Sequence, residues 1–268
     1  MRFGFCIHFG LKDIIKAIKK AKRLGFNYVD ITIDHPTMME VDVREIKRLL
    51  KDYEMEIGIQ TPWETIFLAS SWEECIRGNL EVIDRCFSFG EKIGSKYLNV
   101  HIREDFGNFL NIWNLTEEKK QLMTETLKEI VSRYSNKMIV TAETPGSSIF
   151  SVPENFNSII RESGCDVCID TGHIWQSTKN NYKKFVHWFN ILNDKIKVIH
   201  LSGGKKTKTR VAPHYVPNLK QLEIMTDCFK RCKNLNYIMF EFFRGVKPEN
   251  LHKREIQILK KLRDEIDY

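Results

Sequence analysis

The chain has no hydrophobic run long enough to cross a bilayer, because its apolar stretches stay short of the roughly 18 to 20 residues that a spanning helix needs. Its first eight residues, Met-Arg-Phe-Gly-Phe-Cys-Ile-His, are too short and too quickly interrupted by polar groups for a signal peptide. They predict a first strand instead. We therefore expect a cytoplasmic protein with no membrane partner.

The sequence also lacks a disulfide framework, since its seven cysteines are odd in number and show no repeated spacing. In a cytoplasmic chain this pattern predicts reduced, buried thiols. Cys165 and Cys168 form one Cys-x-x-Cys, but Cys168 falls inside a strand-like run and no second pair completes a zinc site. We therefore expect this pair neither to bind metal nor to take part in redox chemistry.

Acidic residues are fewer than basic ones, with 35 Asp and Glu against 42 Lys and Arg, which gives a formal net charge of +7. Many of the lysines fall on helix faces, where they are typical of a solvated surface. The mild excess of basic over acidic residues is compatible with an anionic substrate, either a sugar phosphate or a nucleic acid. The hydrophobic content of 42% is ordinary for a globular protein with a sizeable core.

Short apolar runs alternate with amphipathic stretches along the whole chain. Strands are expected at residues 2–8, 28–34, 56–61, 97–102, 138–143, 167–170, 196–201 and 237–242. Helices are expected at residues 11–24, 43–53, 72–93, 117–134, 153–162, 182–192, 219–232 and 248–265. Gly25, Gly94 and Gly164 mark helix ends, and Ser71 with Glu74 predicts a capping box.

Eight strand–helix units with short connections and no low-complexity linker predict a fold of the α/β class, a (β/α)₈ TIM barrel. Such a barrel typically needs about 250 residues, so residues 1–268 would form a single domain. The alternative is a doubly wound open sheet. That fold usually has a glycine-rich phosphate-binding turn after its first strand, and here the turn reads His-Phe-Gly-Leu-Lys.

Four acid or imidazole side chains stand at the carboxyl ends of the last four predicted strands: Glu143, Asp170, His200 and Glu241. In a closed parallel barrel these ends converge on one mouth, so the four groups would meet. Each acid alone could be a helix N-cap or a salt-bridge partner. Together, three carboxylates and one imidazole favour a divalent metal, because unpaired buried charges are costly.

These residues resemble those of the xylose isomerase-like barrel superfamily. The resemblance rests on Glu143, the Asp-Thr-Gly-His of Asp170 to His173, the His200 of His-Leu-Ser-Gly and Glu241, and it covers essentially the whole chain in element order. The group includes D-tagatose 3-epimerase-type ketose epimerases, hydroxypyruvate isomerase, inosose dehydratase and endonuclease IV. It implies one divalent ion on the four residues, with Mn²⁺ favoured and Mg²⁺, Co²⁺ or Zn²⁺ as alternatives.

The resemblance further implies a sugar isomerase or epimerase that works by proton transfer through a cis-enediolate. Glu143 and Glu241 would be the acid/base pair, one removing the proton and the other returning it to carbon. His173 would hydrogen-bond a substrate oxygen. The alternative is that Thr171-Gly172-His173 only forms a turn in the backbone. The substrate would be a small sugar or sugar phosphate. The oligomeric state is not predicted, and a homodimer is one possibility.

Two alternatives keep the same barrel. Endonuclease IV-type enzymes, which hydrolyse phosphodiesters in abasic DNA, hold two further zinc ions, and His101 and His214 match two of the histidines concerned. Gln60 and Ala212 stand where two other ligands are expected, so each extra site would lose a ligand. His101 and His214 are therefore expected to contact substrate, and nucleic acid is not the expected partner. An inosose dehydratase-like lyase would use the same proton abstraction.

Other candidates for the rim of the mouth are basic or aromatic. The epimerases' substrate arginine is missing after His200, and Lys206 or Arg210 could replace it and bind an anionic group. A solvated basic loop is the alternative. Trp63 is expected to line the pocket, while the aromatic residues of the following loop would pack against the barrel or form a dimer contact. These are Phe106, Phe109 and Trp113.

Overall fold

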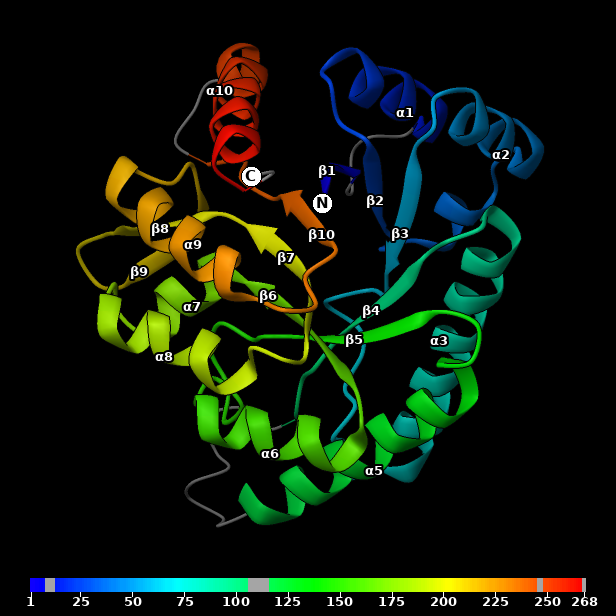
Figure 1. The fold of residues 1–268 in the computed structure, drawn as a ribbon. Helices are drawn as coiled ribbons and strands as arrows, with labels where there is room; N and C mark the ends of the chain where they lie inside the picture. Colours follow the sequence, from blue (N-terminus) through cyan, green and yellow to red (C-terminus); the bar gives the residue numbers. More distant parts are fainter. Residues whose placement is uncertain (8–12, 106–115, 245–247, 267–268) are drawn as a thin grey trace.

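The computed structural model describes residues 1–7, 13–105, 116–244 and 248–266. His8, Leu11, Phe106, Phe109 and Trp113, which figure in the expectations above, lie outside this part of the chain. The described strands and helices alternate as expected, and the helices form a ring around the strands (Figure 1).

Eight parallel strands close into a barrel in the order β1-β10-β7-β6-β5-β4-β3-β2. Their bounds are Arg2–Ile7 (β1), Tyr28–Thr32 (β2), Glu56–Gln60 (β3), Tyr97–His101 (β4), Ile139–Glu143 (β5), Asp166–Asp170 (β6), Ile196–Leu201 (β7) and Tyr237–Phe240 (β10). The barrel closes where β1 pairs with β10, with Arg2 opposite Tyr237. The predicted (β/α)₈ TIM barrel is thus confirmed.

The helices begin and end close to the predicted limits. They are α1 (Ile14–Arg23), α2 (Val43–Asp52), α3 (Glu73–Ile93), α5 (Thr116–Tyr134), α6 (Pro153–Ser163), α7 (Thr171–Ser177), α8 (Tyr182–Leu192), α9 (Leu219–Arg231) and α10 (Pro248–Ile266), with a 3₁₀ turn, η1 (Pro36–Met39). Gly25, Gly94 and Gly164 follow three of them with φ of +88°, +82° and +77°. Glycine adopts this left-handed conformation at no steric cost, which explains its use at helix ends.

The predicted capping box at α3 is wrong. Trp72 is the N-cap, and it makes no side-chain capping bond. The Ser71 hydroxyl instead accepts a hydrogen bond from the buried Lys119 ammonium, and the Ser71 amide donates to Asp105 at 2.8 Å. A charged partner from α5 has displaced the local capping bond, since hydrogen bonds to charged groups are the stronger ones.

The 3₁₀ turn η1, helix α7 and a β-hairpin were not predicted. Helix α7 is only seven residues long and follows β6 without a loop. An antiparallel hairpin, β8 (Gly203–Lys206) and β9 (Val211–Tyr215), follows β7 and forms a separate two-stranded sheet. Its sequence, Gly-Gly-Lys-Lys-Thr-Lys-Thr-Arg-Val, has no alternating apolar pattern that would indicate a strand.

Successive side chains of a strand point to opposite faces, and so the barrel has two cores. The outward side chains join those of the helices in the main core. The inward ones make a smaller core of Cys6, Tyr28, Tyr97, Cys168, Val198, Tyr237 and Met239. Gly4 and Gly58 make room for it, since a Cβ there would come within 2.1 Å of the Tyr28 ring and 2.3 Å of the Tyr97 ring.

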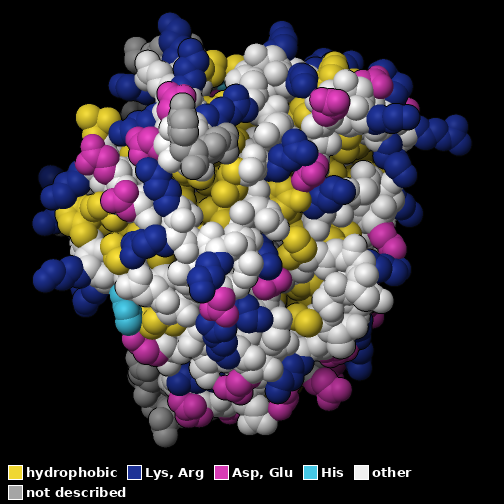
Figure 2. Space-filling view, viewed as in Figure 1, with side chains coloured by type: hydrophobic (Ala, Val, Ile, Leu, Met, Phe, Trp, Pro, Cys, Tyr) yellow, Lys and Arg dark blue, Asp and Glu magenta, His cyan; other side chains and the backbone are white. Residues whose placement is uncertain are grey.

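The surface carries charges of both signs. On the face shown in Figure 2, Lys and Arg side chains intermingle with Asp and Glu rather than gathering in one patch. Within the described residues, no helix is both long and apolar enough for a membrane span.

Candidate metal and active site

The four predicted ligands meet at the carboxyl mouth of the barrel. Glu143 and Asp170 end β5 and β6, His200 is the fifth residue of β7, and Glu241 follows β10 directly. His200 Nδ1 lies 3.1 Å from Glu143 Oε2 and 3.4 Å from Glu241 Oε2. Ligand atoms of Asp170, His200 and Glu241 lie within 4.8 Å of one another, as do those of Glu143, Cys168 and His200.

Several polar atoms of this cluster are buried without a hydrogen-bond partner among the described residues. They are Asp170 Oδ2, both ring nitrogens of His200 and Glu241 Oε2. The ring is close to two carboxylates but not aligned for a hydrogen bond. Buried polar groups of this kind are costly unless something binds them, and three oxygen donors with one nitrogen suit a hard divalent cation. The residues therefore fit the metal that the sequence predicted.

The cluster holds opposite charges close together. Burial would raise the pKa of Glu143, but His101 and His200 outweigh it and hold that pKa well below its usual range. Burial is likewise outweighed at Glu241, where His200 and His214 lower the pKa to about 2. Burial alone would lower the pKa of His200, yet Cys168 and Glu143 raise it well above its ordinary value. The two glutamates are thus ionised and ready to bind a cation.

Asp170 differs from them, because burial raises its pKa despite His173 and His214. One of its oxygens, Oδ1, accepts a hydrogen bond from the His173 amide at 3.0 Å and so caps helix α7. The other oxygen, Oδ2, is unpartnered within the described chain. Asp170 therefore acts as a helix cap through one oxygen and offers the second as a ligand.

His173 stands in the first turn of α7, where the cap directs its ring back over the mouth. Nδ1 lies 2.9 Å from the Thr144 carbonyl oxygen, 3.3 Å from Asp170 Oδ2 and 3.5 Å from Glu143 Oε1. A carbonyl oxygen can only accept, so Nδ1 carries the hydrogen, and Nε2 is left for another partner. His173 thus joins the cluster that the sequence predicted.

His101 and His214 also come to the mouth. His101 Nε2 is 3.3 Å from Glu143 Oε2, and its Nδ1 is 3.0 Å from the Thr61 carbonyl oxygen. His214 lies on β9 at a φ of +61°, and its ring contacts that of His173 edge to face, with centroids 5.2 Å apart. Asp170, His173 and His214 form a second group that could hold a metal.

Trp63, Lys206 and Arg210 are not brought into contact with the four ligands by any interaction described for this structure. Trp63 is 50% exposed after β3, and its carbonyl accepts a hydrogen bond from Arg103. Lys206 is exposed at the end of β8, where it pairs with Val211, so it and Arg210 lie at the free end of the hairpin, away from the base beside β7. Their roles in substrate binding stay predictions.

Sequence reasoning did not place Cys168 or Asn99 beneath the ligands. Cys168 faces inward two residues before Asp170, and Asn99 faces inward two residues before His101 and donates to Glu143 Oε2 at 2.7 Å. The period-two alternation of strands could have placed both on the ligand-bearing face. Cys165 is in the main core outside the barrel, so the two thiols of the Cys-x-x-Cys lie on different sides of the barrel wall. Cys168 belongs with Glu143 and His200 to a group that could hold a metal, which the sequence analysis did not expect of it.

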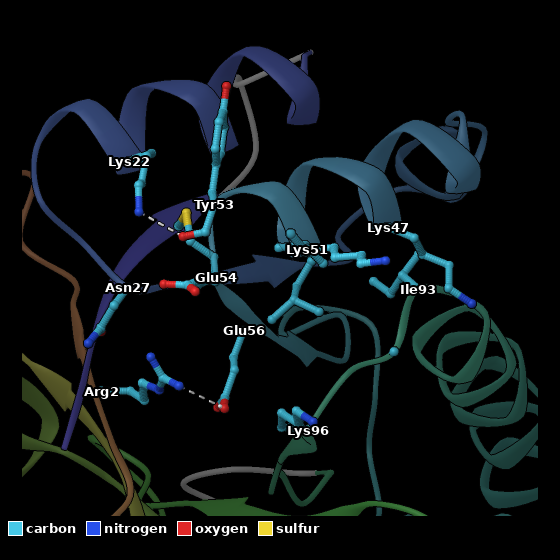
Figure 3. A pocket seen from close by; sticks show the side chains of 14 residues that line it. Arg2, Lys22, Asn27, Lys47, Lys51, Tyr53, Glu54, Glu56, Ile93 and Lys96 are labelled. Atoms are coloured by element: carbon cyan, nitrogen blue, oxygen red, sulfur yellow. Dashed lines mark hydrogen bonds and ion pairs between the residues drawn. The ribbon is translucent and has the colours of Figure 1, made fainter.

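A separate hollow of about 700 Å³ opens at the opposite end of the barrel, beside the carboxyl ends of α1 and α2 (Figure 3). Lys22 donates to the Tyr53 carbonyl at 2.7 Å there, and Arg2 pairs with Glu56 at 3.3 Å. Lysines at carboxyl ends of helices offset the helix dipole and its free carbonyls. This accounts for Lys22 and Lys51, which stand in the last turns of α1 and α2.

Comparison with known proteins agrees with the geometry. The family model of the xylose isomerase-like TIM barrel matches residues 18–262. The chain belongs to this family. A search of curated protein sequences found no significant match to this xylose isomerase-like barrel.

Solved structures share the fold at low sequence identity. A D-psicose 3-epimerase crystallised in the presence of D-fructose has a TM-score of 0.76 and 11% identity, with both chains covered in full. A D-tagatose 3-epimerase-like protein has a TM-score of 0.73 and 16% identity, over 100% of this chain and 98% of that one. Endonuclease IV from Thermus thermophilus has a TM-score of 0.69 and 16% identity, over 100% and 99%. At such identities the likeness concerns the fold alone.

Proposed function

We propose that this xylose isomerase-like barrel is a divalent-metal-dependent sugar isomerase or epimerase. The observation that carries the proposal is the convergence of Glu143, Asp170, His200 and Glu241 at the mouth of the barrel. Within the described residues, Asp170, His200 and Glu241 each have a buried ligand atom without a hydrogen-bond partner. The fold shared with a D-psicose 3-epimerase supports it. We propose one ion on these residues, with Mn²⁺ the favoured metal and a ketose or its phosphate as substrate.

A bound divalent cation would polarise a substrate carbonyl and acidify the proton on the neighbouring carbon. The protein's own groups would then move that proton. Glu143 and Glu241 come from β5 and the end of β10, on opposite sides of His200, so their carboxylates would flank the substrate from two sides. One would take the proton and the other would return it.

The position of proton return decides the product. Return to the opposite face of the same carbon gives an epimer, and return to the adjacent carbon converts a ketose into an aldose. His173, whose Nδ1 faces the Thr144 carbonyl, would in its protonated form donate from Nε2 to a substrate oxygen and stabilise the negative charge that develops there. His101 and His214 would contact the substrate from the neighbouring sides of the rim.

Solvent exchange tests this proposal. The wild-type protein, given Mn²⁺ and a panel of ketoses and their phosphates in D₂O, should incorporate deuterium at a carbon beside the carbonyl, as seen by NMR. Glu143→Gln and Glu241→Gln should each slow exchange by about 10²- to 10⁴-fold, the range expected when a general acid or base is lost.

Glu154→Gln is the matched control. It changes an exposed carboxylate on α6 that pairs with His187, and exchange should be unaffected. Exchange that persists at the wild-type rate in both Glu143→Gln and Glu241→Gln would rule out the assigned acid/base pair. Loss of water from a substrate, without isomerisation, would show that the same proton abstraction serves a lyase.

The second candidate is phosphodiester hydrolysis of the endonuclease IV type. The group of Asp170, His173 and His214 favours it, since it could hold a further metal. Against it, Gln60 donates its side-chain amide to Asp30 at 2.8 Å, and Ala212 offers no ligand atom. Cleavage of an abasic-site oligonucleotide, with more than one metal ion bound per chain, would favour this candidate over the sugar enzyme.

A further inference from the structure

A series of hydrogen-bonded polar side chains lies inside the barrel beneath the metal ligands. The proposed reaction assigns these side chains no role. Asn99 lies on β4, directly beneath Glu143, and its Nδ2 donates to Glu143 Oε2 at 2.7 Å. Asn99 is fully buried and Glu143 is 3% exposed, so water does not compete for this bond. A charge-assisted hydrogen bond in such surroundings is a strong constraint on the carboxylate.

The orientation of the Asn99 amide is fixed by its neighbours. Asn99 Nδ2 lies 2.7 Å from Glu143 Oε2, so the NH₂ end of the amide faces the carboxylate and donates to it. Asn99 Oδ1 then accepts from the Thr141 hydroxyl at 3.0 Å, and Nδ2 also lies 3.5 Å from Gln60 Oε1. The side chain is therefore held at both ends of its amide group.

Gln60 is in turn fixed from below. Its Nε2 donates to Asp30 Oδ1 at 2.8 Å, and the other Asp30 oxygen accepts from the Tyr97 hydroxyl. Asp30, Gln60 and Tyr97 are at most 1% exposed. A carboxylate at each end of the series, Asp30 and Glu143, sets the direction of the amide hydrogen bonds between them.

The two oxygens of Glu143 consequently face different partners. Oε2 is bound by Asn99 and lies 3.1 Å from His200 Nδ1 and 3.3 Å from His101 Nε2, whereas Oε1 lies 3.5 Å from His173 Nδ1. A free carboxylate on a flexible side chain would sample several orientations. The hydrogen bond from Asn99 selects the one in which Oε2 is directed to His200 and His101 and Oε1 to His173.

We propose that Asn99 is a positioning residue for Glu143, anchored in turn by Thr141, Gln60 and Asp30. The inference rests on the proposed function, in which Glu143 binds metal and moves a proton. It assigns a role to a buried amide in the floor of the barrel that the metal ligands themselves do not explain.

Two substitutions test the role of the amide. Asn99→Leu keeps the size and removes the donor, and Asn99→Asp places a second carboxylate beside Glu143, where like charges would repel. Mn²⁺ affinity, measured by calorimetry, should fall about 10- to 100-fold for Asn99→Leu, as when an outer partner of a metal ligand is lost, and further for Asn99→Asp. Thr141→Val, which leaves the donor in place, should show a smaller loss.

Asn27→Leu is the matched control, because Asn27 is a barrel asparagine at the opposite end, where its Oδ1 accepts from the Phe3 amide at 2.6 Å. Its Mn²⁺ affinity should equal that of the wild type. An unchanged affinity in Asn99→Leu, or an equal loss in Asn27→Leu, would overturn the proposal.

Metal-free crystal structures separate this inference from the proposed function. In Asn99→Leu, the Glu143 carboxylate should turn away from the position it holds in the wild type. If it stays in place, the positioning role is refuted. This comparison decides the matter even if the wild-type protein binds no Mn²⁺, a result that would instead count against the metal-dependent function.

Discussion

Asp30 illustrates how far burial can shift the pKa of a single side chain. Burial raises its pKa from 3.8 to about 6, although His200 and the hydrogen bond from Gln60 lower it. The group lies among tyrosine rings in the lower half of the barrel, without access to solvent. A carboxyl group in such surroundings keeps its proton to a higher pH than in the unfolded chain.

This shift has a defined effect on stability. Between pH 4 and 6 the unfolded chain loses the Asp30 proton first, so the free energy of unfolding falls as pH rises, by about 3 kcal/mol in total for this group. Carboxyl ¹³C NMR of the metal-free protein should show one aspartate titrating near pH 6, and that signal should be absent from Asp30→Asn. A pKa of 4 or below for Asp30 would contradict the prediction.

The ligand residues could be predicted from the sequence, but their supporting partners could not. Glu143, Asp170 and His200 stand out because each is a polar group in or at the end of an apolar run. Asn99 and Gln60 also lie in apolar runs, but their importance depends on which strands are neighbours. Asn99 reaches Glu143 because β4 pairs with β5 in a register that sets His101 opposite Glu143.

At the scale of elements, helix α7 links the fold to the site through Asp170. We predict that Asp170→Asn preserves the helix, because Asn Oδ1 can still accept from the His173 amide and caps helices as well as Asp does. Mn²⁺ affinity should nevertheless fall more than the roughly 10- to 100-fold expected for an outer partner, since a charged ligand is lost.

Hydrogen exchange at the His173 amide and calorimetric Mn²⁺ titration measure the two effects separately. Asp170→Ala, which loses both functions, is the comparison and should also expose the His173 amide. Unchanged metal affinity in Asp170→Asn would show that Asp170 is only a cap.

A second element-scale prediction concerns the junction of α3 and α5. The Lys119 ammonium is fully buried, lies 2.6 Å from Asp105 Oδ1 and donates to Ser71. Lys119→Met should lower the free energy of unfolding by about 3 kcal/mol, because it leaves the Asp105 carboxylate without its buried partner. Urea denaturation measures the loss.

Lys120→Met is the control, because the neighbouring Lys120 pairs with the exposed Glu117 and such surface pairs contribute at most about 1 kcal/mol. Equal stability of the two variants would contradict a structural role for Lys119. The same junction explains why the capping box was predicted wrongly: the partner that engages Ser71 comes from 48 residues further along the chain.

Elements with a strong period were predictable, and short irregular ones were not. Helix α3, with 21 residues and one apolar face, was predicted to within one residue at its amino end. Helix α7 has seven residues, and in the hairpin β8–β9 Gly203 and Gly204 fit tightly against neighbouring side chains and backbone. Such fits depend on the folded barrel and leave no periodic signal.

At the scale of the whole molecule, the inward side chains of the barrel change from aromatic to polar toward the carboxyl ends of the strands. In the lower interior the Tyr237 ring contacts those of Tyr28 and Tyr97, with ring centroids 5.1 and 5.2 Å apart. The hydrogen-bonded series from Asp30 to Glu143 lies above them, and the ligands follow at the mouth. The repeated strand–helix order was enough to predict this architecture, because parallel neighbours joined by helices close in few ways.

The central claim is that Glu143, Asp170, His200 and Glu241 together bind one divalent ion. Anomalous diffraction at the manganese edge, on crystals soaked in Mn²⁺, tests it most directly. We predict a single strong peak within bonding distance of all four side chains. A mouth without a peak, or a peak that these side chains do not surround, would contradict the account.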